Sequence, residues 1–304
     1  MTSKLIPSDP SKVMVIRQVT PNITTCSAPF LRFGRLKVGG RGTIVRLQSG
    51  ALAVFSPTAL TPEVRSTVES MGNKVGYIAA LDYEHHIFIT DWAKAFPSAK
   101  LLGVEGLAEK REKDKATAGS KFQHIWTQKN KASMNVDPEF DGEFDYEYVG
   151  SHSNKELVFV HKRDRTLIEA DLEICLGNVV SRNVIQLSIS SLPSAILTAR
   201  FQFSMMFNLP AKEQFSRTGE DSTSGILTKL FIGLQNTMGS ATWQKRFLWY
   251  AASAGDRQGF NQSARKIASW DFDKIIPCHG DVIESGGKDI FKKVFDWHLN
   301  APVQ

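Results

Sequence analysis

Four side chains of the types that bind transition metals follow apolar, strand-like segments of the chain. They are His85, His86, Asp171 and His279. Imidazole nitrogen and carboxylate oxygen bind Zn²⁺, Mn²⁺ or Fe²⁺ at about 2.0–2.2 Å, and three or four such ligands with an open position form a catalytic site. Strand ends suit such a site, because a rigid sheet fixes the ligands while the loops leave room for a substrate. The pattern therefore predicts a metal site at one edge of a sheet.

Each of these residues also has a simpler explanation. Adjacent histidines point to opposite sides of a strand, so His85 and His86 face one site only if they lie in a turn. Asp171 could cap the segment that follows it. His279 precedes Gly280, and glycine permits a close approach of the backbone. The order of the whole set, rather than any single member, favours the metal site. Other histidines are expected to be ordinary polar residues: His124, His161 and His298.

The segments that must position these residues alternate between strand and helix. Ser49-Gly50 has the turn chemistry of a hairpin between two apolar runs. Thr61 followed by Pro62 predicts the start of a helix, with the threonine as its cap. The next expected elements are a strand at 75–80, a helix at 91–96 and a strand at 100–104. This alternation is typical of an α/β layered fold.

The second half of the chain returns to strands and then changes character. A strand pair is expected at 156–161 and 165–170. Residues 176–269 are apolar at helical spacing, which predicts a helical insertion that caps the sheet. Residues 288–299 form a closing amphipathic helix in this interpretation. We therefore expect a single domain over 1–304 that contains the insertion.

Composition excludes several classes of partner. The chain has 37 Lys and Arg against 31 Asp and Glu, and the net charge of +6 is dispersed among acidic residues. This distribution argues against a nucleic-acid partner. The three cysteines have no close spacing and suit a reducing compartment, and the sequence shows no leader-like or membrane-spanning run. We expect a soluble cytoplasmic protein that acts on a small-molecule substrate and has no membrane partner, with its oligomeric state left open.

Three motifs resemble the metal-binding motifs of the metallo-β-lactamase-like superfamily. Residues 81–86 (LDYEHH) stand where that superfamily has His-x-His-x-Asp-His, 166–171 (TLIEAD) are similar to its bridging-aspartate strand, and 277–280 (PCHG) to its last histidine motif. Further positions are similar to one branch, the DUF4336 type: Trp92, Phe96-Pro97, Gly106-Leu107 and Lys110-Arg111. The resemblance covers nearly the whole chain. It implies an α/β fold, an αββα sandwich with a helical insertion.

The resemblance also implies a reduced metal site. Matching His86 to the last histidine of the first motif puts His85 at the aspartate position and leaves Leu81 and Tyr83 where two histidines stand. One divalent metal is implied instead of two, with zinc as first choice and Mn or Fe as alternatives, bound by the four ligand-type residues named above. His152 is a candidate for a missing histidine. Candidate catalytic residues, which would orient a ligand or move a proton, are Asp82, Tyr83 and Glu84.

A single metal is sufficient for hydrolytic chemistry, because it lowers the pKa of a bound water and polarises a carbonyl. The first hypothesis is therefore a metal-dependent hydrolase of a small, partly apolar ester, lactone or thioester, with the apolar insertion as a hydrophobic lid. Two alternatives stay open. The same scaffold could run a non-hydrolytic cyclase or lyase reaction, or the chain could be a catalytically inactive relative that binds a ligand or partner.

Overall fold

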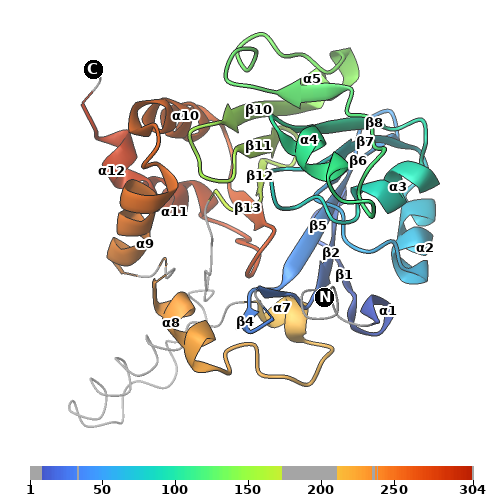
Figure 1. Ribbon diagram of the computed structural model, residues 1–304, viewed down its shortest axis with the longest axis horizontal. Helices are drawn as coiled ribbons and strands as arrows, with labels where there is room; N and C mark the ends of the chain where they lie inside the picture. Colours follow the sequence, from blue (N-terminus) through green and yellow to red (C-terminus); the bar gives the residue numbers. More distant parts are fainter. Residues whose placement is uncertain (1–8, 33, 173–210, 235–236, 238, 303–304) are drawn as a thin grey trace.

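Two β-sheets lie face to face between two layers of helices (Figure 1). The computed structural model describes residues 9–32, 34–172, 211–234, 237 and 239–302. Within these residues the first sheet has seven strands and the second has four, and β3 (Leu31–Arg32) and β4 (Leu36–Lys37) form a separate small hairpin. This is the αββα arrangement that the sequence predicted.

The first sheet combines an antiparallel half with a parallel half. In spatial order its strands are β1 (Val15–Gln18), β2 (Ile23–Ala28), β5 (Gly40–Arg46), β6 (Leu52–Phe55), β7 (Val75–Ala79), β8 (Lys100–Val104) and β9 (His124–Trp126). Neighbours are antiparallel as far as the β5–β6 pair and parallel from the β6–β7 pair onward. Parallel neighbours end at the same edge, so the segments after β7 and β8 emerge side by side.

The second sheet brings together segments that are distant in the sequence. Its strands are β10 (Phe144–Val149), β11 (Glu156–His161), β12 (Thr166–Glu169) and β13 (Lys274–Pro277). The pairs β10–β11 and β11–β12 are antiparallel, whereas β12 and β13 are parallel, with Glu169 opposite Pro277. The chain therefore leaves β12 and β13 at the same edge of the sheet.

The helices cover the outer faces of both sheets. Beside the first sheet lie α2 (Pro62–Ser70), α3 (Ile89–Ala95) and α4 (Leu107–Glu112), and beside the second lie α10 (Arg257–Ser269), α11 (Gly287–Val294) and α12 (Asp296–Leu299) (Figure 1). The other helices are α1 (Pro10–Val13), α5 (Pro138–Glu143), α7 (Lys212–Phe215), α8 (Ile226–Leu234), α9 (Thr242–Phe247) and the π-helix η2 (Leu248–Ala252). No helix among the described residues is long and apolar enough to cross a membrane.

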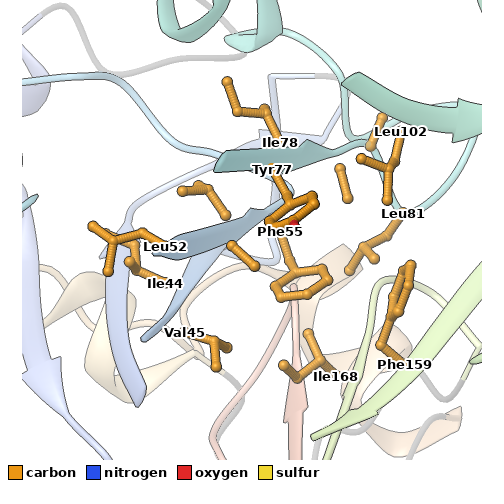
Figure 2. Close-up of a cluster of buried hydrophobic side chains, with 14 of the residues drawn as sticks. Ile44, Val45, Leu52, Phe55, Tyr77, Ile78, Leu81, Leu102, Phe159 and Ile168 are labelled. Carbon is orange, nitrogen blue, oxygen red and sulfur yellow. The ribbon is translucent and has the colours of Figure 1, made fainter. Parts of the chain in front are cut away.

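The side chains of strand β11 alternate between two hydrophobic cores, one on each face of the second sheet. Phe159 points into the space between the sheets, where it meets Phe55 of β6 at 5.0 Å between ring centroids and lies near Ile168 of β12 (Figure 2). Its neighbours Val158 and Val160 point the other way and pack with apolar residues of α10 and α11. Both faces of the strand are buried, because successive side chains alternate sides.

Local sequence signals explain several element boundaries. The β5–β6 hairpin turns at Gly50, whose φ of +84° favours glycine. Helix α2 begins where expected, with the Thr61 hydroxyl accepting a hydrogen bond from the Val64 amide. The closing helix expected over 288–299 is instead divided into α11 and α12 at Phe295.

Part of the predicted insertion over 176–269 lies outside the described residues, namely 176–210, 235–236 and 238. The described part contains α7, α8, α9, η2 and α10. Of these, α10 packs on the second sheet through Phe260, Ala264 and Ile267. The limits of the insertion, and the single domain over 1–304, stay predictions.

Candidate metal centre

Three strand ends meet at one edge of the sandwich and bring three of the four predicted ligands together. His85 lies in the turn after β7 of the first sheet, Asp171 follows β12, and His279 follows β13 of the second sheet. The Nε2 atoms of His85 and His279 lie 3.0 Å apart, and Asp171 Oδ1 lies 3.4 Å from His279 Nε2. These three ligand atoms all lie within 4.8 Å of one another. The structure thus brings three of the four predicted ligands together, and their role as metal ligands stays a prediction.

The far atom of each side chain is held by a hydrogen bond, so the near atom is directed inward. His85 Nδ1 donates to Asp82 Oδ2 at 3.0 Å, and His279 Nδ1 donates to the Gly39 carbonyl at 2.7 Å. Asn154 Nδ2 donates to Asp171 Oδ2 at 2.7 Å. Metal-binding histidines in proteins are usually oriented in this way, by a carboxylate or carbonyl on the second ring nitrogen.

The inward oxygen of Asp171 lacks a hydrogen-bond partner in the described part of the chain. Asp171 Oδ1 is buried and accepts no hydrogen bond among the described residues. A buried carboxylate oxygen without a partner is costly, because it loses its interaction with water. Two imidazole nitrogens and this oxygen form the donor set that a divalent transition metal takes. The residues therefore fit such an ion.

The backbone around the histidines is fixed by residues close in sequence and by one that is far away. Asp82 Oδ1 accepts the amides of Glu84 at 2.8 Å and His85 at 2.6 Å, which forms the tight turn after β7. Arg41 of β5, 2% exposed, donates through Nη1 to the carbonyls of Pro277 at 2.8 Å and Gly280 at 2.7 Å. These two carbonyls bracket His279, so an arginine of the first sheet holds a ligand loop of the second.

Electrostatics assign opposite protonation states to the two imidazoles in the absence of an ion. Burial lowers the pKa of His85, but the charges of Asp82 and Asp171 outweigh it and raise that pKa to about 9. Burial lowers the pKa of His279 to about 4. Burial also opposes ionisation of Asp82, yet the charge and hydrogen bond of His85 lower its pKa to about 2. An incoming metal must therefore displace one proton, which His85 carries.

His86 lies in a different environment from His85. Its Nδ1 is 3.1 Å from Arg111 Nη1, and its carbonyl accepts from the same Nη1 at 2.5 Å. Because arginine only donates, Nδ1 must accept and the proton of the ring sits on Nε2. Burial, with the charges of Lys110 and Arg111, lowers the pKa of His86 to about 4. His86 is therefore neutral, and it is not among the described residues whose ligand atoms form the group with His85.

The three predicted catalytic residues have different surroundings. Asp82 is fully buried behind His85. Tyr83 lies with its ring 4.3 Å from Lys110 Nζ, and Glu84 accepts a hydrogen bond from the same Nζ at 3.0 Å. His152 is buried, and its Nδ1 accepts the Asn154 amide at 3.1 Å. Only Asp82 among these contacts a member of the ligand group directly.

A buried glutamate that sequence reasoning did not identify holds the backbone of Asp171 by a hydrogen bond. Glu156 of β11 is fully buried, and its Oε1 accepts the backbone amide of Asp171 at 2.8 Å. Asp82, Glu156 and Asp171 form a second group with oxygens within 4.8 Å of one another. Burial and the neighbouring carboxylates raise the pKa of Glu156 well above its usual range. Its place at the start of an apolar strand gave no signal of this role.

A cavity of about 320 Å³ opens beside the ligand group. His85 and His279 form part of its wall, together with His86 and Glu84. Its apolar wall includes Phe30, Pro57, Ile87 and Phe88, and Arg32 adds a positive charge. A partly apolar molecule of small size fits such a cavity, with the ligand group at one side.

The family of the chain follows from its sequence. A family model described as "Domain of unknown function (DUF4336)" matches residues 32–200. The chain belongs to the DUF4336 family. The matched region contains His85, His86 and Asp171 and leaves His279 outside. No curated protein sequence matches the chain.

Solved structures show which fold this DUF4336 chain has. It is similar to a metallo-beta-lactamase from Pontibacter korlensis at 8% identity and a TM-score of 0.52, covering 95% of this chain and 100% of that one. It is also similar to DIM-1 metallo-beta-lactamase at 11% identity and a TM-score of 0.51, covering 95% and 98%. A metal-soaked Flv1 flavodiiron core from Synechocystis sp. matches at 11% identity and a TM-score of 0.50, covering 94% and 60%. The DUF4336 chain thus has the metallo-β-lactamase-like fold.

Proposed function

We propose that this protein is a metal-dependent hydrolase of a small, partly apolar ester, lactone or thioester, with one divalent metal bound by His85, Asp171 and His279. The observation that carries the proposal is the convergence of two Nε2 atoms and the unpartnered Asp171 Oδ1 beside a cavity. Two nitrogens bound to one zinc at 2.0–2.1 Å with tetrahedral geometry lie about 3.3 Å apart. The 3.0 Å between the two Nε2 atoms is close to this value.

A divalent metal at this place would act as a Lewis acid and activate water. The chain supplies the rest of the machinery. Asp82 and the Gly39 carbonyl fix the ring orientation and keep the Nε2 lone pairs directed inward. His86 lies in the wall of the cavity, and its neutral ring carries its proton on Nε2, so it could donate a hydrogen bond to a substrate oxygen.

The cavity wall supports the substrate class. Phe30, Ile87 and Phe88 provide apolar contact for an acyl chain or ring, and a volume of about 320 Å³ favours a small molecule. Arg32 places a positive charge in the same cavity wall as His85 and His279. Such a charge favours substrates with a polar or anionic oxygen near the reacting bond.

A protein that binds a ligand through the metal without turnover is the second candidate. The observation that favours it is the ion pair between Glu84 and Lys110, with 3.0 Å between Oε1 and Nζ. Glu84 is a predicted base in the cavity wall, and this ion pair ties its carboxylate to Lys110. A non-hydrolytic cyclase or lyase would use Tyr83 for proton transfer. The ring of Tyr83 packs against Lys110, which does not favour that role.

Metal content and turnover separate these candidates. Protein purified without added metal should contain about one equivalent of Zn, Mn or Fe by elemental analysis, and His279→Ala should lose it while the matched control His124→Ala keeps it. Metal-loaded protein should hydrolyse p-nitrophenyl esters, lactones or acyl thioesters of short chains. Bound metal without turnover on all three classes would favour the binding protein. A wild type that binds none of the three metals would overturn both.

A further inference from the structure

Large apolar side chains that reach the surface concentrate in one part of the described chain. Seven large hydrophobic residues of the described ranges are exposed, and six of them lie between positions 226 and 250: Ile226, Leu227, Leu230, Trp243, Phe247 and Tyr250. The seventh is Ile87, which lines the cavity beside the metal centre. Scattered single residues need no explanation, but a concentration in neighbouring helices indicates an interaction surface.

Helix α9 and its continuation η2 present an aromatic face. Trp243, Phe247 and Tyr250 are 56%, 36% and 68% exposed, and their spacing of four and three residues puts them on one side of the helix. Gln244 and Leu248, which lie to one side of this face, are buried. The helix therefore packs on the protein with one face and leaves the aromatic face uncovered by the described residues.

Helix α8 adds an aliphatic face. Ile226, Leu227 and Leu230 are 79%, 54% and 61% exposed, whereas Thr228 and Ile232 are buried. Both α8 and α9 lie at the periphery of the molecule, on the side away from α2 and α3 (Figure 1). Surface helices of globular proteins normally direct their apolar residues inward, so the outward arrangement requires a partner.

The charges of the same segment indicate what that partner is. Residues 222–255 contain Lys229, Lys245 and Arg246 and no Asp or Glu. Lys245 pairs with Asp296, Lys229 acts on the charge of Asp221, and the side chain of Arg246 is exposed. The Arg246 guanidinium lies 4.9 Å from the centre of the Trp243 ring. Arg246 is thus an exposed cation beside an exposed aromatic ring, and such a cation attracts an anionic surface.

We propose that α8, α9 and η2 form a docking surface for an anionic lipid bilayer. Trp and Tyr favour the interface between lipid and water, aliphatic side chains enter its outer acyl region, and Lys or Arg bind anionic headgroups. The faces described above contain all three kinds of side chain. The proposal is independent of the metal centre and differs from the sequence-based expectation that no membrane takes part. Binding at the surface requires no helix that crosses the bilayer.

Sedimentation with lipid vesicles tests the proposal on the full chain. Vesicles of phosphatidylcholine with phosphatidylserine should bind the wild type at least about tenfold more strongly than pure phosphatidylcholine, and added salt should reduce the difference. Replacing Trp243, Phe247 and Tyr250 together by serine should abolish binding to both. Arg246→Glu should weaken binding to the anionic vesicles about tenfold, whereas the control Lys129→Glu, at an exposed lysine elsewhere, should have little effect.

Several outcomes would overturn the docking surface. One is equal sedimentation of the wild type and the triple variant, provided that thermal unfolding shows both to be folded. Another is a dimer in solution that dissociates in the triple variant, because a second copy would then cover the face. A third is slow hydrogen exchange of residues 242–252 in the vesicle-free monomer together with no binding, because the chain itself would then cover them.

Discussion

Replacement of Asp82 by asparagine tests whether the ligand group is built to bind a metal. The change keeps the size of the side chain and one oxygen, so the turn held by the amides of Glu84 and His85 can persist. It removes the oxygen that accepts the His85 Nδ1 proton at 3.0 Å and the charge that acts on that ring. The fold should survive while the orientation and the proton affinity of His85 change.

The expected magnitude has two opposing parts. Loss of a carboxylate behind a metal-binding histidine weakens metal affinity about 10–100-fold, or about 1.4–2.7 kcal/mol. In the wild type the pKa of His85 is raised from 6.5 to about 9, so at pH 7 the metal displaces a proton and its affinity is reduced about 100-fold. The competition between this proton and the metal weakens in the wild type as pH rises through 9. In Asp82→Asn, which lacks the Asp82 charge, the competition is already weak at pH 7. The two effects should nearly cancel at pH 7, and the full loss should be seen at pH 9.

A zinc titration against a chromophoric chelator at pH 7, 8 and 9 measures both parts. Wild-type affinity should rise about tenfold per pH unit, the affinity of Asp82→Asn should change little, and Asp91→Asn, at an exposed carboxylate on α3, should behave as wild type. Equal affinities and equal slopes for wild type and Asp82→Asn would refute the reasoning. Circular dichroism of each variant confirms that a loss of affinity does not come from unfolding.

Three further outcomes follow from the same structure. His85→Ala should lose the metal and His86→Ala should retain it, as elemental analysis would show, because only the first ring belongs to the ligand group. Arg41→Met should lower the free energy of unfolding by about 3–5 kcal/mol in urea titrations, because the carbonyls of Pro277 and Gly280 and the carboxylate of Glu213 each lose a buried partner. Burial lowers the pKa of His298 to about 4. Since this folded pKa is below the unfolded one, its contribution, at most about 3 kcal/mol, is lost as pH falls from 6.5 toward 4, and His298→Gln should make the stability less steep in that range.

The sequence was sufficient where structure is decided by near neighbours. The helix start at Thr61 and the hairpin at Gly50 depend on a capping hydroxyl and a turn glycine, and both lie where they were predicted. Asp171 and His279 could be paired because they follow two apolar strands, and the parallel pairing of β12 and β13 places them at one edge. Motif order therefore predicted the fold, and three of the four residues that it named as ligands lie together in the structure.

The rest depends on contacts between distant residues. His86 and His85 are adjacent and look alike in the sequence, but Arg111, 25 positions later, engages His86 and orients it differently. Arg41 reaches Pro277 and Gly280 from more than two hundred positions away. Glu156 resembles any acidic residue at a strand start until Asp171 folds onto it. Such roles follow from the tertiary structure, which no local pattern encodes.

The three candidate ligands come from both halves of the sandwich, and a metal bound there would affect how long the folded protein lasts. His85 belongs to the first sheet and His279 to the second, 194 positions apart. An ion held between them would fasten the two sheets, and the unfolded chain could not bind it in the same way. By mass action, free metal at 100 times its Kd stabilises the folded state by about 2.7 kcal/mol. Metal starvation would therefore shorten the lifetime of the protein in the cell, so that its abundance follows the supply of the ion.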